Sequence, residues 1–204
     1  MSIIIIDYGL GNLTSVYNAL KFLGTDVKIS ERPEDVAGAD KIILPGVGAC
    51  GDAVTGLKEK KLFDPLKQSI MEGKTYLGIC LGLQLLFEKS QEGDIYGLGI
   101  LKGQVLRFDE KNNIKVPHIG WNGVVYRTRD KKCRLLDGIE DGSYFYFDHS
   151  YYAAPAEAEM FCGSTVYGSA FTSMIWKNNI YAVQFHPERS QNLGLRLLKN
   201  FIEL

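Results

Sequence analysis

The sequence of 204 residues contains no apolar run near the roughly 20 residues that a membrane-spanning helix requires. Its charges almost cancel, with a formal net charge of −1, so the charge balance gives no reason to expect binding to nucleic acid or to a membrane surface. The opening residues lack the basic leader and the length of a secretory signal peptide, which predicts a cytoplasmic protein. With 46% hydrophobic and 23% charged residues, the composition predicts one globular domain over residues 1–204.

Cysteine and histidine are also scarce. The four cysteines are widely spaced and include no C-x-x-C pair, which argues against a zinc site or a disulfide framework and fits a reducing compartment. We therefore expect neither a metal nor a cofactor. With only three histidines, the base for a cysteine nucleophile would come from a short list: His118, His149 and His186.

Short apolar runs alternate with helical patterns in the first 90 residues. This alternation, joined by short loops, predicts a mostly parallel sheet with helices on both faces. The predicted strands are residues 3–6, 26–29, 41–45 and 76–79, and the predicted helices are residues 13–23, 53–71 and 81–87.

The second half of the chain is richer in glycine, valine and aromatic residues, with few helical periods. A hairpin is predicted to turn at residues 178–179, between strands at 174–177 and 180–185. No linker separates this part from the first, so we expect an antiparallel region appended to the parallel sheet. A last helix is predicted at residues 191–204.

Gly78, Cys80 and Gly82 form a G-x-C-x-G pattern between a predicted strand and a predicted helix. This is the pattern of a nucleophile elbow, a tight turn that presents one side chain above the sheet. The following helix amino terminus favours negative charge and therefore the thiolate. With no partner identified, a buried structural cysteine fits the same residues equally well.

A second glycine-rich segment, Pro45-Gly46-Val47-Gly48, follows the strand at 41–45. Its N–H groups can point at a ligand, although a simple turn before the next helix would use the same residues. In parallel sheets ligands gather at the carboxyl ends of the strands, so this loop and Cys80 are expected at one edge. The turn at residues 9–11 lacks the third glycine of a dinucleotide loop, and Asn12 fits a helix cap better.

His186, Pro187 and Glu188 follow an apolar strand. Proline keeps the preceding residue extended, which places residues 186 and 188 on the same side of the backbone. Glu188 would then orient His186, and His186 would take a proton from Cys80. The structural alternative is that His186 only ends a strand with its hydrogen bonds satisfied, while Glu188 is solvated.

A nucleophile of this kind also needs donors for the oxyanion that forms during attack. The N–H of Leu81, directly after the nucleophile, is one predicted donor. The N–H of Val47, after a peptide rotation, is the second.

The chain resembles the class I (triad) glutamine amidotransferases over nearly its whole length, and within them the glutaminase subunits of imidazole glycerol phosphate synthase. The segments that carry the resemblance are residues 7–12 (DYGLGN), 45–48 (PGVG), 78–84 (GICLGLQ), 117–122 (PHIGWN), 149–151 (HSY) and 184–188 (QFHPE). The resemblance implies a flavodoxin-like fold with an appended antiparallel sheet.

It also implies that glutamine is hydrolysed through a thioester on Cys80, with His186 moving protons and Glu188 orienting it. Ammonia would pass to a separate (βα)8-barrel cyclase subunit that makes imidazole glycerol phosphate and an aminoimidazole carboxamide ribotide. His118 is expected to be structural. The implied contacts to glutamine come from Gly46, Gly48, Gln84 and the backbone of His149, Ser150 and Tyr151, and those to the partner from Trp121, Asn122 and Arg189.

Three positions depart from the family pattern: Cys50 where phenylalanine is usual, Asp148 where an apolar residue is usual, and Arg189 in place of lysine. They leave open a glutaminase that feeds another synthase, such as a sugar amidotransferase. The elbow alone also fits a cysteine peptidase or γ-glutamyl hydrolase, but Gln84 and the PGVG segment favour free glutamine. A binding module that had lost the chemistry would be expected to lack part of the triad.

Overall fold

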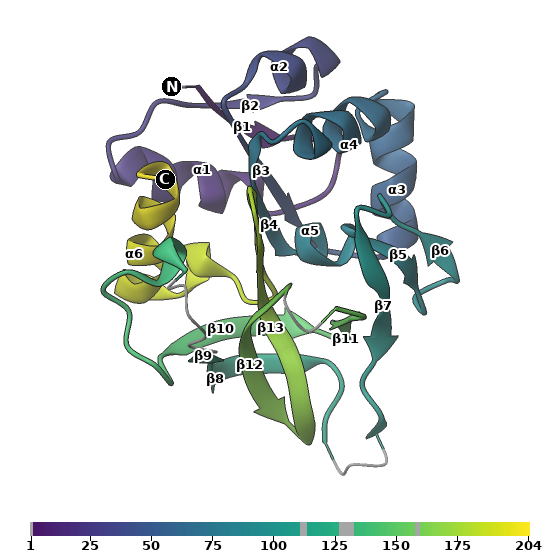
Figure 1. The fold of residues 1–204 in the computed structure, drawn as a ribbon, viewed down its shortest axis with the longest axis vertical. Coiled ribbons are helices and arrows are strands. Elements are labelled where there is room, and N and C mark those ends of the chain that lie inside the picture. The colour runs from purple at the N-terminus through teal and green to yellow at the C-terminus, as the bar shows by residue number, and fades with distance from the viewer. Residues whose placement is uncertain (1, 111–113, 127–132, 158–159) are drawn as a thin grey trace.

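The computed structural model describes residues 2–110, 114–126, 133–157 and 160–204. In the first half, strands and helices alternate as the sequence predicts (Figure 1). These elements are β1 (Ile3–Ile6), α1 (Leu13–Phe22), β2 (Val27–Ser30), α2 (Pro33–Gly38), β3 (Lys41–Gly46), α3 (Cys50–Glu59), α4 (Phe63–Met71), β4 (Thr75–Cys80) and α5 (Leu81–Gln84).

The second half consists mainly of strands. They are β5 (Phe87–Ser90), β6 (Ile95–Tyr96), β7 (Leu101–Arg107), β8 (His118–Gly123), β9 (Val125–Tyr126), β10 (Tyr144–His149), β11 (Tyr151–Pro155), β12 (Phe161–Tyr167), β13 (Ser169–Lys177) and β14 (Ile180–Val183). Two 3-10 turns, Arg134–Leu136 and Pro187–Arg189, and the final helix α6 (Gln191–Ile202) complete the described part of the chain.

One mixed sheet carries most of the described strands, in the order β2-β1-β3-β4-β14-β13-β11-β7-β5-β6. The pairs from β2 to β14 are parallel, and β14 turns back on β13 to begin the antiparallel region. The expected mostly parallel sheet with an appended antiparallel region is therefore confirmed. A separate two-stranded sheet pairs β8 with β10.

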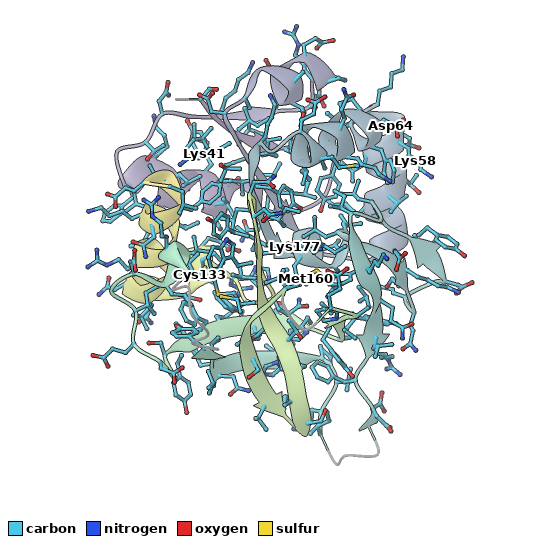
Figure 2. All side chains as sticks on the ribbon, viewed as in Figure 1. Lys41, Lys58, Asp64, Cys133, Met160 and Lys177 are labelled. Carbon is cyan, nitrogen blue, oxygen red and sulfur yellow. The ribbon has the colours of Figure 1, made fainter. Side chains whose placement is uncertain are left out.

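Helices cover both faces of the parallel strands, and the side chains of β1 show the division. Ile4 and Ile6 pack with residues of α2, α3 and α4, whereas Ile3 and Ile5 pack with residues of α1 and α6. Figure 1 shows α1 and α6 on one side of these strands and α3 and α4 on the other. Figure 2 labels one buried residue from each cluster, Met160 and Cys133.

Several predicted boundaries are confirmed. Asn12 caps α1 by accepting a hydrogen bond from the N–H of Ser15 at 3.4 Å, and the β13–β14 hairpin turns at Asn178, whose φ is +55°. No helix in the described residues is long and apolar enough to cross a membrane.

Two predicted helices are wrong in length, and one helix was not predicted. The helix expected over residues 53–71 is divided into α3 and α4 at Lys61, where φ is +56°. The helix expected over residues 81–87 ends at Gln84, because the carbonyls of Leu85 and Leu86 accept hydrogen bonds from the N–H groups of residues 98, 100 and 101. The unpredicted helix is α2.

Candidate active site

Cys80 ends β4 and begins α5 with φ +54° and ψ −105°, a conformation that is strained for a residue with a side chain. The glycines on either side allow the strand and helix to approach closely. A Cβ atom at position 82 would overlap the carbonyl oxygen of Leu44, and one at position 78 would lie 2.6 Å from the carbonyl oxygen of Gly82. The strand–turn–helix geometry of a nucleophile elbow is therefore present.

His186 reaches the elbow because β14 is parallel to β4, with Val183 opposite Ile79. His186 Nδ1 lies 2.8 Å from Glu188 Oε1, and the side chains of both residues are only 1–2% exposed. His186 is extended, with φ −102° and ψ +95°, as Pro187 predicts. The following backbone is a 3-10 turn and not the extended segment we expected, so the turn brings Glu188 back to the imidazole.

The charges of the site favour the imidazolium form of His186. Burial by itself lowers the pKa of His186, but the Cys80 thiolate and the Glu188 carboxylate outweigh it and raise that pKa to about 10. The Nε2 atom has no hydrogen-bond partner among the described residues. It is therefore the ring nitrogen that is available to exchange a proton with the sulfur or with a substrate.

The predicted oxyanion donors lie beside Cys80. Gly46 is opposite Cys80 in the β3–β4 register, and Leu81 is the first residue of α5, whose N–H has no acceptor within the helix. Val47 is 41% exposed and Gly48 has φ +99°. Among the described residues, no loop or turn hydrogen bond involves the backbone of Val47 or Gly48, so this peptide is free to rotate.

Tyr8 supports the base of that loop, a role that the sequence analysis missed. Its hydroxyl donates a hydrogen bond of 3.0 Å to the carbonyl of Pro45, and burial raises the pKa of Tyr8 far above the usual value. A Cβ atom on Gly46 would collide with this hydroxyl. Tyr8 and Leu81 thus exclude any side chain at position 46 and keep its backbone accessible.

Gln84 and Tyr151 are in direct contact. Gln84 Nε2 donates 2.9 Å to the carbonyl of Tyr151 and 3.2 Å to Gln184 Oε1. Gln184 is the second residue that the sequence analysis missed, and its Nε2 lies 3.5 Å from Cys80 Sγ. The available signal was its position two residues before His186 at a strand end, where alternate residues face the same side.

The segment from Asp148 to Tyr151 borders the nucleophile. Cys80 Sγ lies 3.8 Å from the carbonyl oxygen of Asp148, and the carbonyl of Ser150 accepts a hydrogen bond from the N–H of Phe108. His149 is buried and its Nδ1 lies 2.8 Å from the carbonyl of Tyr151. The predicted substrate-binding backbone therefore lies next to Cys80 at the sheet edge.

Two of the three predicted partner residues belong to one surface cluster, which we define as Trp121, Tyr146 and Arg189. The Arg189 guanidinium lies 4.2 Å from the ring centre of Tyr146, and Trp121 meets the same ring edge-on at 6.2 Å. Arg189 Nη1 also lies 3.6 Å from Asp148 Oδ2, so two of the departures from the family pattern face each other. The third residue, Asn122, lies outside this cluster and faces His118 and the carbonyl of Val166.

Cys50 is a poor rival to Cys80. It is fully buried at the start of α3, where its N–H donates 2.8 Å to Glu92 Oε2. Burial, and to a lesser degree Glu92, raise the pKa of the Cys50 thiol to about 11. Cys50 therefore stays protonated at neutral pH.

Comparison with known proteins agrees with this geometry. The model of the glutamine amidotransferase class-I family matches residues 4–204, and the chain belongs to that family. Solved structures with the same fold include a glutamine amidotransferase, at TM-score 0.75 and 19% identity over 98% of this chain and 97% of that one. Another is the glutaminase domain of Trypanosoma brucei CTPS, at TM-score 0.68 and 16% identity over 100% and 94%.

Curated relatives are much closer in sequence. The imidazole glycerol phosphate synthase subunit HisH of Desulfitobacterium hafniense is 48% identical over 198 residues, covering 97% of this chain and 92% of the relative. The protein of the same name from Aquifex aeolicus is 46% identical, covering 98% and 96%.

Proposed function

We propose that this chain is the glutaminase subunit of an imidazole glycerol phosphate synthase and serves histidine biosynthesis. The observation that carries the proposal is a cysteine at a strained elbow beside a buried histidine–glutamate pair. Full-length similarity to imidazole glycerol phosphate synthase subunits supports the assignment to this synthase. Two of the three residues that depart from the family pattern, Asp148 and Arg189, contact each other within this chain. Their presence therefore needs no different synthase to explain it.

The proposed reaction begins with attack of the Cys80 thiolate on the carboxamide carbon of glutamine. The N–H groups of Leu81 and Val47 stabilise the oxyanion. His186 then gives the Nε2 proton to the departing nitrogen, so that ammonia leaves and a glutamyl thioester remains. Water, deprotonated by His186, hydrolyses the thioester to glutamate, while Glu188 keeps the imidazole oriented.

Substrate recognition follows from which polar atoms remain available. Both hydrogens of the Gln84 amide are already donated, to the carbonyl of Tyr151 and to Gln184. The Oε1 atom is therefore left to meet glutamine, and an oxygen accepts a hydrogen bond from the α-ammonium group. The backbone of residues 149–151 would hold the rest of the amino-acid head, with Gly46 and Gly48 beside the carboxamide.

Ammonia is proposed to pass to a (βα)8-barrel cyclase subunit that docks over the Trp121–Tyr146–Arg189 cluster. The N–H of His186 donates 2.8 Å to the carbonyl of Tyr146, so this cluster adjoins the triad. The Arg189–Asp148 pair is partly exposed and contributes about 0–1 kcal/mol, so a partner carboxylate can replace Asp148 at low cost.

The test is a glutaminase assay on the purified chain, first alone and then with the cyclase partner carrying its nucleotide ligand. An unrotated Val47 peptide would leave the oxyanion with one donor fewer, a loss of about 10²–10³ in rate. The chain alone should bind glutamine and turn it over slowly, and the ligand-bound partner should restore the rate. Full activity without a partner would contradict the proposal and indicate a self-sufficient hydrolase.

A further inference from the structure

Gln184 is completely buried at the end of β14, next to the nucleophile. The β4–β14 register pairs Val183 with Ile79, so the next residue on each strand, Gln184 and Cys80, lie side by side. Gln184 Nε2 lies 3.5 Å from Cys80 Sγ, in donating geometry. The triad mechanism as described above makes no use of this contact.

The orientation of the Gln184 amide follows from its neighbours. A carbonyl can only accept hydrogen bonds, so the Gln84 atom that lies 2.9 Å from the carbonyl of Tyr151 must be its NH₂ group. The same NH₂ group lies 3.2 Å from Gln184, whose nearer atom must therefore be its oxygen. Gln184 consequently turns its own NH₂ group toward the sulfur.

The Tyr151 carbonyl is itself fixed from the other side. It accepts a hydrogen bond from His149 Nδ1 at 2.8 Å, which leaves His149 Nε2 to accept from His118 Nδ1 at 3.1 Å. Burial lowers the pKa of His149 to about 3 and that of His118 to about 4, so both rings stay neutral and keep these roles at physiological pH. The donor and the acceptor of each hydrogen bond between His118 and Cys80 are therefore assigned, and the Tyr151 carbonyl accepts from both His149 and Gln84.

This arrangement discriminates between the two protonation states of Cys80. The thiol can donate its proton to the carbonyl of Asp148, 3.8 Å from the sulfur. The thiolate has no proton to donate; it faces the positive charge of the His186 imidazolium and, in addition, accepts from the Gln184 N–H. Hydrogen bonds to charged groups are stronger than those to neutral ones, so the Gln184 contact stabilises the thiolate more than the thiol.

We propose that Gln184 is a positioning residue for the nucleophile: its amide, held by Gln84 and the Tyr151 carbonyl, fixes Cys80 and stabilises its thiolate before glutamine binds. The inference rests on the proposed role of Cys80. It predicts that Gln184 controls the pH at which Cys80 becomes reactive, which a residue that only fills the core would not do.

The experiment measures the rate of carbamidomethylation of Cys80 by iodoacetamide on the full chain from pH 5 to pH 10, with the modified residue identified by peptide mass. Gln184→Met removes both polar atoms at similar length. Gln184→Glu keeps the oxygen that accepts from Gln84 but removes the donor to Cys80. The matched controls are Gln104→Met and Gln104→Glu, at an exposed position on β7.

We expect the midpoint of the alkylation profile to rise by about one to two pH units in Gln184→Met, the effect of losing one hydrogen bond to a charged group. Gln184→Glu should show a larger rise, because its carboxylate also repels the thiolate. The limiting rate at high pH should be retained, and both Gln104 variants should match the wild type.

A folded Gln184 variant with the wild-type midpoint would overturn the proposal, and circular dichroism checks that each variant is folded. If Gln184→Met does not fold, the Gln184→Glu variant tests the proposal. It is expected to fold because it keeps the oxygen that accepts the hydrogen bond from Gln84. A different outcome would contradict the proposed function: in the wild type, a cysteine other than Cys80 would be the one that is rapidly alkylated. Rapid alkylation of wild-type Cys80 with unchanged variant midpoints would reject only the role of Gln184.

Discussion

The two halves of the candidate site are built in opposite ways. The side chains of His186 and Glu188 are almost completely buried and joined by a 2.8 Å hydrogen bond, and Ser190 Oγ donates to the His186 carbonyl at 2.6 Å. Val47, by contrast, is 41% exposed, and a Cβ atom on Gly48 would meet nothing within 4 Å. The proposed proton-transfer groups are preassembled, whereas the proposed oxyanion loop, residues 46–48, has room to change shape. Regulation is therefore expected to act on the loop and leave the triad unchanged.

Loss of the nucleophile should have the largest effect. Cys80→Ala should lower glutamine-dependent synthesis by the complex by at least about 10⁴-fold, because the thioester cannot form. Synthesis from free ammonia should survive, since the proposed acceptor site lies in the proposed partner. Assays of the complex with glutamine and with ammonium salt measure both, and Cys50→Ala serves as the control that keeps substantial activity. Glutaminase turnover by Cys80→Ala would contradict the mechanism.

Within the buried half, His186 and Glu188 should differ in effect. His186→Ala removes the group that moves the proton, whereas Glu188→Gln keeps a neighbour near Nδ1 and removes only its charge. We expect turnover to fall about 10- to 100-fold less in Glu188→Gln than in His186→Ala, as for orienting carboxylates in other triads. Steady-state turnover of each folded variant in the complex measures the difference. Equal and complete losses would assign Glu188 a chemical step of its own.

Two glycine substitutions test the contrast between the rigid and adaptable regions. Gly82→Ala forces a Cβ atom against the Leu44 carbonyl and should cost about 1–3 kcal/mol of the free energy of unfolding. Gly48→Ala meets no atom, but its φ of +99° disfavours a side chain by about 1 kcal/mol.

Because Gly48 belongs to the oxyanion loop, Gly48→Ala should change partner-stimulated turnover more than stability. Urea unfolding and glutaminase assays of both variants measure the two effects. A Gly48→Ala variant that loses stability as severely as Gly82→Ala would show that the loop is rigid and remove the contrast.

The sequence predicted the parts of the fold that local chemistry determines. The elbow requires glycines at fixed positions, the α1 cap requires Asn12, and the hairpin requires a residue such as Asn178 that tolerates positive φ. The division between α3 and α4 had a signal that the sequence analysis did not use, because Pro65 lies inside the expected helix and is tolerated only in the first turn of α4. The positive φ of Lys61 itself has no such local signal. The early end of α5 depends on hydrogen bonds to a segment more than ten residues away.

The same distinction applies to the site. The positions of Cys80, His186 and Glu188 as candidate site residues could be predicted because each lies in a short sequence motif. Tyr8 could not, because it reaches the site only through its packing against the Pro45 carbonyl. Gln184 had a weaker signal, its position two residues before His186, but its contact with Cys80 depends on the β4–β14 register. The Asp148–Arg189 contact likewise joins residues that are 41 positions apart.

The last prediction concerns the protonation states of the three histidines and changes no catalytic group. It tests the buried hydrogen-bond network that includes His118 and His149. His118 and His149 should both carry their proton on Nδ1 and remain neutral down to about pH 5, because burial lowers their pKa values to about 4 and about 3. His186 should remain an imidazolium at pH 8, because its pKa is raised to about 10. Nitrogen-15 NMR of histidine-labelled protein distinguishes these forms, with His186 as the internal reference.

The consequences for stability follow from which state binds more protons. Below the ordinary histidine pKa of 6.5 the unfolded chain binds protons that folded His118 and His149 do not bind. Their contribution to stability is therefore complete above pH 6.5 and is lost as the pH falls toward 4 and then 3. The raised pKa of His186 acts in the opposite sense, since its contribution is complete below pH 6.5 and is lost as the pH rises toward 10. A titration of His118 or His149 near pH 6.5, or an Nε2-protonated tautomer of His149, would contradict the directions given to the His118–His149 and His149–Tyr151 hydrogen bonds. The orientation of Gln184 would stay, because it is set by the hydrogen bond from Gln84 to the Tyr151 carbonyl.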